Sequence, residues 1–280
     1  MLELQEMENI CSQVRRDIVR MVHNVQSGHP GGSLGCVEFL VALYFDIMDH
    51  NVEFNMDGTN EDVFFLSNGH ISPVFYSVLA RSGYFPIKEL NTFRKIDSRL
   101  QGHPTTNEHL PGVRIASGSL GQGLSVAIGT ALTKIINKDS KKAYCLCGDG
   151  ELQEGQVWEA IMYAGSKKVN NLILTIDVNR QQICGSTNDV LNMGSLKDKF
   201  LAFDWGVIEE TNGNNIKSVL NTIRSIKNTI QTKPVCILLH TEMGNGVDYM
   251  MGSHKWHGIA PNDEELKIAL NQLTETLGDY

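Results

Sequence analysis

Two polar residues, Asp149 and Asn179, each follow an apolar run of strand length and could share one ligand. Asp149 stands between two glycines in GDGELQEG (148–155), where the backbone can turn tightly and approach a bound group. An aspartate there either caps the next helix or binds something charged. Asn179 follows NLILTIDV (171–178). Carboxylate and amide oxygens suit Mg²⁺ or Ca²⁺ better than a soft metal.

The helix expected after Gly150 would point its backbone amides at the same place, which favours a bound phosphate group. A diphosphate held to the protein through a divalent cation is therefore the predicted ligand. Other phosphate motifs do not fit. GSLGQG (118–123) has its glycines in the wrong order for a dinucleotide fingerprint, and the sequence contains no P-loop pattern. This disfavours a nicotinamide enzyme and a P-loop nucleotidase.

Alternating strands and helices would position these residues. Apolar strand-like runs occur at 62–67, 142–147, 171–178 and 234–241, and helical patterns at 4–25, 35–49, 72–82, 119–137, 154–166 and 216–230. This alternation predicts an α/β fold, a parallel sheet flanked by helices on both faces. Ligands then bind beyond the carboxyl ends of the strands. With neither an internal repeat nor a low-complexity linker, residues 1–280 are expected to form a single domain.

Composition narrows the class of protein. The chain has 280 residues, 41% hydrophobic and 20% charged, with a net charge of -8, which argues against nucleic-acid binding. The six cysteines form no CxxC pair and are expected to be reduced, buried thiols. The N-terminus does not resemble a signal peptide, and the run CVEFLVALYFDIM (36–48) is too short and too charged to span a membrane. A cytoplasmic protein is expected.

Six short strings, in order along the chain, resemble transketolase. They are SGHPGG (27–32), LSNGH (66–70), GHP (102–104), GSLGQG (118–123), GDGELQEG (148–155) and WHG (256–258). GDG followed by DVN is also similar to the thiamine diphosphate signature. Each string alone is weak, but six in order make a chance match improbable. The resemblance covers essentially the whole chain and implies the diphosphate-binding domain of a thiamine diphosphate-binding fold.

The resemblance implies a cofactor site for thiamine diphosphate and Mg²⁺, for which Ca²⁺ or Mn²⁺ can substitute. Asp149 and Asn179 match the metal-ligating side chains, and Gln181 matches the residue whose carbonyl is the backbone ligand. The remaining matches are cofactor contacts: the Gly150 amide, His70 and His257 at the diphosphate, Ile183 at the thiazolium ring, and Gly118 and Leu120 beside the aminopyrimidine.

The resemblance also assigns roles to histidines and glutamates. His29 and His103 match residues that face the donor sugar, where breaking a carbon–carbon bond requires protons to move on hydroxyl groups. His257 is included with them as a catalytic candidate. Glu154 and Glu159 match glutamates at the subunit contact near the cofactor; solvated helix acids are the alternative. His254, in HKWH, has no assigned role.

Length sets the chain apart from full transketolases, because the sequence resembles only their first domain. We expect a separate C-terminal transketolase subunit to carry the pyrimidine-binding domain and its catalytic glutamate, within an α₂β₂ particle. The expected reaction transfers a two-carbon ketol unit from a ketose to an aldose. Pentose phosphates, apulose phosphate and sulfosugars stay open as substrates. The alternatives are a thiamine diphosphate enzyme acting on a 2-oxo acid and a non-catalytic paralogue.

Overall fold

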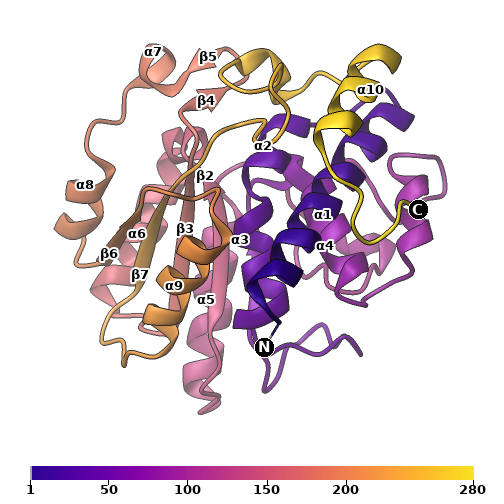
Figure 1. Ribbon diagram of the computed structural model, residues 1–280. Coiled ribbons are helices and arrows are strands. Elements are labelled where there is room, and N and C mark those ends of the chain that lie inside the picture. Colours follow the sequence, from indigo (N-terminus) through magenta and orange to yellow (C-terminus); the bar gives the residue numbers. More distant parts are fainter. Residues whose placement is uncertain (1) are drawn as a thin grey trace.

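A five-stranded parallel sheet forms the centre of the computed structural model, which describes residues 2–280 (Figure 1). The strands lie in the order β1-β2-β3-β7-β6, and each neighbouring pair is parallel. Their bounds are β1 Val63–Leu66, β2 Ala143–Gly148, β3 Leu172–Val178, β6 Gly206–Glu210 and β7 Val235–His240. The α/β fold expected from the sequence is confirmed.

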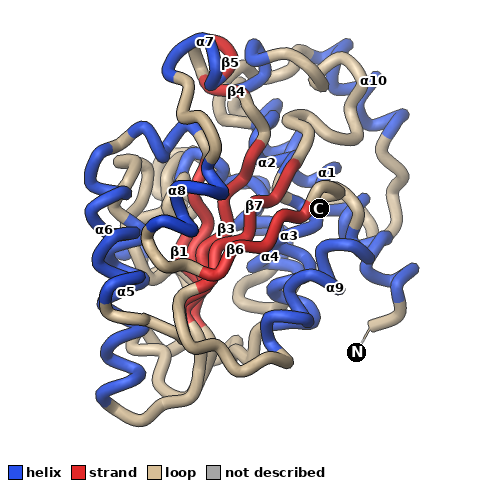
Figure 2. The backbone as a smooth tube through the Cα atoms, turned by 90° about the vertical axis from the view of Figure 1, so that its left-hand side faces the viewer, coloured by secondary structure: helices blue, strands red, loops and turns tan. Residues whose placement is uncertain are grey.

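Helices cover both faces of this sheet, as Figure 2 shows. One layer consists of α5 (Gly123–Ile136), α6 (Gly155–Ser166) and α8 (Leu196–Ala202). The other contains α1 (Leu4–Asn24), α3 (Val37–Ala42), α4 (Ser72–Arg81) and α9 (Ile216–Lys227). The remaining α-helices are α2 (Pro30–Gly35), α7 (Thr187–Leu191) and α10 (Asp263–Gln272). A two-stranded hairpin, β4 (Gln181–Gln182) and β5 (Gly185–Ser186), follows β3.

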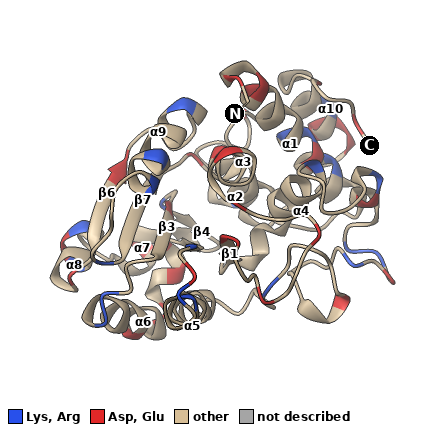
Figure 3. Ribbon diagram, turned by 90° about the horizontal axis from the view of Figure 1, so that it is seen from below, with Lys and Arg blue, Asp and Glu red and all other residues tan. Residues whose placement is uncertain are grey.

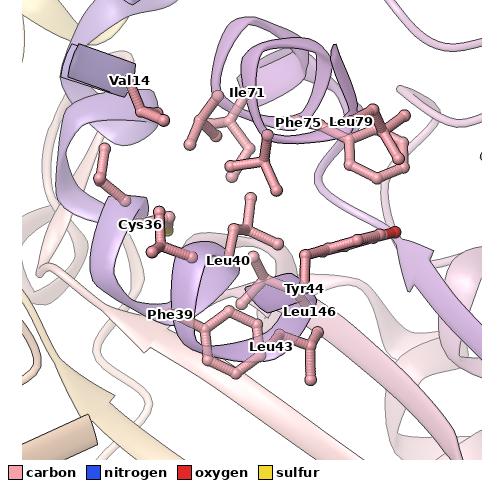
Figure 4. Close-up of a cluster of buried hydrophobic side chains, with 14 of the residues drawn as sticks. Val14, Cys36, Phe39, Leu40, Leu43, Tyr44, Ile71, Phe75, Leu79 and Leu146 are labelled. Atoms are coloured by element: carbon pink, nitrogen blue, oxygen red, sulfur yellow. The ribbon is translucent and has the colours of Figure 1, made fainter. Parts of the chain in front are cut away.

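The strands are apolar on both faces because each face packs against a helical layer. In β2, Tyr144 and Leu146 join the core beneath α1, α3 and α4, while Cys145 and Cys147 join the core beneath α5 and α6. Successive side chains of a strand point to opposite faces, so one strand contributes to two cores. Figure 4 shows the first core, in which Leu146 lies among side chains such as Leu40 and Ile71.

Several elements differ from the sequence prediction. Residues 206–210 form an edge strand that was not predicted, because the segment GVIEE ends in two glutamates. The helix expected over 35–49 is observed as α3 and a π-helical turn at Leu43–Ile47, and α2, which was not predicted, precedes it. The helix expected from 119 begins only at Gly123, because the preceding loop contains Gly121 with a φ of +84°.

The remaining features of the fold are the distribution of charged side chains, the state of the cysteines and the polarity of the helices. Lys and Arg are interspersed with Asp and Glu around the outer elements, as Figure 3 shows from below. All six cysteines are free thiols; five are buried as expected, whereas Cys184 is exposed at the tip of the β4–β5 hairpin. Within residues 2–280, every helix is too short or too polar to cross a membrane.

Candidate functional site at the carboxyl ends of the strands

The two polar residues singled out in the sequence meet because their strands are neighbours. β2 pairs with β3, and Gly148 lies opposite Asp177 in the register. Asp149 and Asn179 therefore leave the same edge of the sheet side by side. The Arg180 backbone amide donates to Asp149 Oδ2 at 2.8 Å, which links the two strand ends directly.

Asp149 is buried and also acts as a cap. Its side chain is 6% exposed, and Oδ1 accepts a hydrogen bond from the Gly150 amide at 2.8 Å. The helix expected at 154–166 is observed as α6, which begins at Gly155, but a 3₁₀ turn at Gly150–Gln153 separates it from Gly150, so its N-terminus does not begin at that residue. Gly150 still lies against the pocket, but a long helix does not start there. Each oxygen of the Asp149 carboxylate keeps a lone pair free for another partner.

Asp177, which the sequence analysis did not single out, lies beneath Asn179. It is 1% exposed and accepts hydrogen bonds from Asn179 Nδ2 at 2.7 Å and from the Thr241 hydroxyl. Burial, and secondly the charge of Asp177, raises the pKa of Asp149 to about 7. Two adjacent buried carboxylates repel one another, and a cation at this place would offset that repulsion.

The donor atoms around this carboxylate pair fit a hard divalent cation. Asn179 Oδ1 accepts from the Gln181 amide at 2.9 Å, which turns the chain so that both residues line the same pocket. Among residues 2–280, no group of three or more His, Cys, Asp or Glu side chains is arranged to hold a metal ion. The ligand set expected from the sequence is of another kind, with one carboxylate, one amide and one carbonyl oxygen.

Four histidines from distant parts of the chain meet beside this edge. The His29 ring centroid lies 5.2 Å from that of His70, 5.7 Å from that of His257 and 6.1 Å from that of His103. The rings of His70 and His257 are 5.0 Å apart. His29 follows α1, His70 follows β1, and His257 ends a 3₁₀ turn at His254–His257. His254 is exposed.

The surroundings keep these imidazoles neutral. Burial, followed by the charges of His257, Arg94 and His103, lowers the pKa of His29 to about 4. Burial is also the main cause that lowers the pKa of His70, His103 and His257. A neutral imidazole can accept a proton at one nitrogen and donate from the other. The cluster is thus suited to proton transfer near neutral pH.

The loop 118–123 closes another side of the site. Gly118 has a φ of +121°, and a Cβ there would lie 2.6 Å from the His103 ring, so glycine is needed for the close contact. Leu120 accepts a hydrogen bond from Gln156 Nε2 at 3.5 Å through its carbonyl. Across the pocket, Ile183 lies in the β4–β5 hairpin with 66% of its surface exposed.

These features surround one pocket of about 260 Å³. Most of the residues expected to bind a cofactor line it: His70, Gly118, Leu120, Asp149, Gly150, Asn179, Gln181, Ile183 and His257, together with His29. His103 lies beside it, in contact with Gly118. Glu154 and Glu159 do not line it; both are exposed, on the N-terminal part of α6.

Two further residues at the site were not singled out by the sequence analysis. Arg94 donates from Nη1 to the Ser27 hydroxyl at 3.0 Å, while its buried Nε has no partner among the described residues. Glu151 is 2% exposed and accepts from the Gly121 and Gly148 amides at 2.7 and 3.1 Å. Arg94 lies outside the six strings, and Glu151 lies inside GDGELQEG, but the spacing of that string gives no sign of its contact with Gly121.

Comparison with known proteins identifies the family of the chain. The family described as "Transketolase, thiamine diphosphate binding domain" matches residues 7–276. An apulose-4-phosphate transketolase subunit from Phocaeicola vulgatus is 38% identical, over 99% of this chain and 95% of its own length. The 6-deoxy-6-sulfo-D-fructose transketolase subunit SqwG of a Clostridium species is 35% identical, over 97% and 96%.

Longer transketolases contain the same fold as one part of their chain. The Campylobacter jejuni transketolase structure superposes with a TM-score of 0.90 and 34% identity, covering 97% of this chain but 43% of that one. The fold and the family match together define a thiamine diphosphate-binding domain. The chain belongs to the transketolase family. Within that family it is similar, over nearly its whole length, to proteins named as transketolase subunits.

Proposed function

We propose that this subunit binds thiamine diphosphate through Mg²⁺ and takes part in transfer of a two-carbon ketol unit from a ketose to an aldose. One observation carries the proposal: a single pocket combines an oxygen-lined end, at Asp149 and Asn179, with neutral histidines at its other side. The first end suits a metal-bound diphosphate. The second suits proton transfer on sugar hydroxyl groups.

Different residues would contact different parts of the cofactor. Asp149, Asn179 and the Gln181 carbonyl would hold Mg²⁺, and the Gly150 amide, His70 and His257 would contact the diphosphate. Ile183 would pack on the thiazolium ring, with Gly118 and Leu120 beside the aminopyrimidine. When bound, thiamine diphosphate supplies a nucleophilic carbon that carries the two-carbon unit.

His29 and His103 would act on the sugar. Cleaving the carbon–carbon bond of a ketose turns a hydroxyl into a carbonyl, so a neighbouring base must accept the hydroxyl proton. Burial and the nearby charge of Arg94 lower the pKa of both rings, which leaves them unprotonated and able to accept it. The same ring returns the proton when the acceptor aldose becomes an alcohol.

A separate protein chain with a pyrimidine-binding domain would complete the site. Several relatives of nearly the same length are named as subunits of a transketolase, which implies a partner chain for each of them. On this chain, α5 and α6 expose apolar side chains, including Val126 (41% exposed), Met162 (53%) and Tyr163 (45%). Such a surface suits a protein contact. Glu154 and Glu159 stand on α6 and would reach the same contact, in a two-fold α₂β₂ assembly.

The substrate is proposed only as a class. Relatives are named for apulose-4-phosphate and for 6-deoxy-6-sulfo-D-fructose, sugars that both carry an anionic group. We propose a ketose with a terminal phosphate or sulfonate as donor. The free thiols support a cytoplasmic location.

Reconstitution tests the function. The purified chain is mixed with a candidate pyrimidine-domain partner, Mg²⁺ and thiamine diphosphate, and a panel of ketose phosphates and sulfonated ketoses is assayed with an aldose acceptor. Ketol transfer should require both chains. Full turnover by this chain alone would contradict the need for a partner. Release of CO₂ from pyruvate, without ketol transfer, would instead identify a 2-oxo acid enzyme.

A further inference from the structure

Glu151 lies at the wall of the pocket and joins the end of β2 to two distant segments of the chain. Its Oε1 accepts from the Ser67 hydroxyl at 2.5 Å and from the Gly121 amide at 2.7 Å, while Oε2 accepts from the Gly148 amide at 3.1 Å. Ser67 follows β1, Gly121 lies in the loop 118–123, and Gly148 ends β2. Hydrogen bonds to a buried carboxylate are stronger than neutral ones and fix the positions of their donors.

Ser67 extends this network by one more bond, to the first residue of α5, where the loop 118–123 ends. A hydroxyl has a single hydrogen, and Ser67 gives it to Glu151, so its oxygen is left to accept from the Gly123 amide at 3.0 Å. Space is equally restricted, since a Cβ on Gly123 would lie 2.5 Å from Ser67 Cβ. Glu151 thereby holds Gly121 directly and Gly123 through Ser67.

The backbone amides bonded to Glu151 and Ser67 fall into two groups, which lie at opposite ends of the pocket. Gly148 immediately precedes Asp149 and Gly150, at the end proposed to bind the diphosphate. The loop 118–123 carries Gly118 and Leu120 at the end proposed to contact the aminopyrimidine. Glu151 is bonded to both ends, so a shift of one strand end is transmitted to the loop.

We propose that Glu151 is a positioning residue that couples the two ends of the pocket, so that a ligand bound at Gly148–Gly150 orders the loop 118–123. This inference rests on the proposed function for the identity of the ligand. Coupling of this kind is reciprocal: a ligand that orders the loop also tightens binding at the strand ends. Glu151 itself need not touch the reacting atoms.

Hydrogen exchange on the full chain, with inorganic pyrophosphate and Mg²⁺ as the probe, tests the coupling. Pyrophosphate has no aminopyrimidine, so it can reach the loop 118–123 only through the protein. In the unaltered chain, exchange should slow at 148–150 and also at 118–123. In Glu151→Gln an NH₂ group replaces one acceptor oxygen and faces a donor. Without ligand, the backbone amides of either 148–150 or 118–123 should then exchange about tenfold faster, because one hydrogen bond to a charged group is lost.

The ligand response distinguishes the possible outcomes. Pyrophosphate should no longer slow both segments of Glu151→Gln together. Ser67→Ala is a milder variant and should loosen the loop 118–123 while leaving 148–150 unchanged. Slowing at 148–150 without any slowing at 118–123 in the unaltered chain overturns the coupling. Absence of slowing at 148–150 refutes the proposed diphosphate site instead, and the ligand-free exchange of Glu151→Gln still tests whether Glu151 holds the loop.

A matched variant controls for the loss of a buried carboxylate. Glu210 is 7% exposed and likewise accepts from a backbone amide, that of Asn212 at 2.7 Å, and from a hydroxyl, that of Thr222 at 2.5 Å. It lies on the edge strand β6. Glu210→Gln should leave exchange at 118–123 and 148–150 unchanged. Equal loosening of both segments in the Glu210 and Glu151 variants would show a general loss of stability and overturn the specific role.

Discussion

The two ends of the pocket are built differently. The diphosphate end (Asp149, Gly150, Asp177 and Asn179) lies where two paired strands stop, and its carboxylates are 6% and 1% exposed with backbone or side-chain donors on them. The open end (Leu120 and Ile183) is formed by a loop and a hairpin tip, and Ile183 is 66% exposed. One end is complete within the chain, whereas the other presents apolar surface for which the described residues provide no cover.

This contrast has a physical origin. A strand end inside a parallel sheet is fixed by hydrogen bonds on both sides, so polar side chains placed there keep their positions without a ligand. The loop lacks such a ladder and depends on side-chain contacts such as those of Glu151, while the hairpin tip extends beyond the two residue pairs of β4 and β5. In the proposed function, the chain would therefore pre-form the metal and diphosphate site, and a partner would complete the ring-binding site.

The largest expected effect is at the diphosphate end. Asp149→Ala should weaken Mg²⁺-dependent thiamine diphosphate binding in the reconstituted complex by more than about 100-fold, because Mg²⁺ tolerates a missing oxygen ligand poorly. Calorimetry measures the affinity. An unchanged thiamine diphosphate affinity would show that Asp149 acts only as a cap.

Asp62 provides the matched control for that variant. It is 5% exposed and, like Asp149, accepts from two backbone amides, those of Asp49 at 3.0 Å and Lys142 at 2.8 Å. It precedes β1 and therefore lies at the amino ends of the strands, away from Asp149 at the carboxyl ends. Asp62→Ala should lower the melting temperature without a comparable loss of cofactor affinity.

The next effect separates binding from turnover. His103→Ala should leave cofactor affinity near normal and lower turnover by about 10²–10⁴-fold, since His103 is proposed to move a proton on the sugar. Steady-state kinetics of the reconstituted enzyme measures this. His109→Ala, an exposed histidine in the same part of the chain, is the control and should be silent. A His103 variant with full turnover would leave that residue a packing role against Gly118.

Sequence patterns predict the diphosphate end better than they predict its supports. Asp149 and Asn179 were found because each follows an apolar strand-length run, and all strands of the main sheet except β6 were expected near their observed places. Asp177 was missed because it lies inside such a run, and only the register shows that it faces the site. Glu151 was missed because its partners Ser67 and Gly121 lie 84 and 30 positions away.

The convergence of the four histidines came only from the family resemblance. No spacing rule places His29, His70, His103 and His257 together, because they follow different elements separated by long stretches of chain. Their packing, once observed, explains why they are neutral: burial is the leading cause of each lowered pKa. Physical chemistry thus accounts for their state but could not locate them from the sequence alone.

A pH dependence of stability follows from His29. Its pKa falls from the ordinary 6.5 to about 4 on folding, through burial and then His257, Arg94 and His103. At this ring the unfolded chain therefore binds more protons between these values, and the contribution of His29 to the free energy of unfolding decreases as pH falls from above 6.5 towards 4. Asp149, whose pKa is raised to about 7, contributes in the opposite direction as pH falls from 7. The loss from His29 is at most about 3 kcal/mol, and less where water reaches the ring.

Denaturant unfolding at a series of pH values measures this loss. His29→Asn should remove only the contribution of His29 to the pH profile, leaving those of His70, His103 and His257, whose pKa values are also lowered, and the opposing contribution of Asp149. His109→Asn should leave the unaltered profile in place. If the unfolding free energy of the His29 variant changed with pH as it does in the unaltered chain, the His29 ring would be hydrated at the open side of the cluster. Its neighbours would then not lower its pKa.

The smallest effect is expected at the open end, from Ile183→Ala. With 66% of its surface exposed, Ile183 contributes little to folding, and the melting temperature of the chain should not change. If its side chain packs on the thiazolium ring, truncation removes about 1 kcal/mol of apolar contact and weakens cofactor affinity about fivefold. Val190→Ala, on the adjacent α7 with 43% exposure, is the matched control. Assembly with the partner chain is measured in parallel, because the same exposed residue could contact that chain. Weaker assembly with unchanged cofactor affinity would show that the hairpin tip contacts the partner chain. The open end would then serve protein association and not binding of the thiazolium ring.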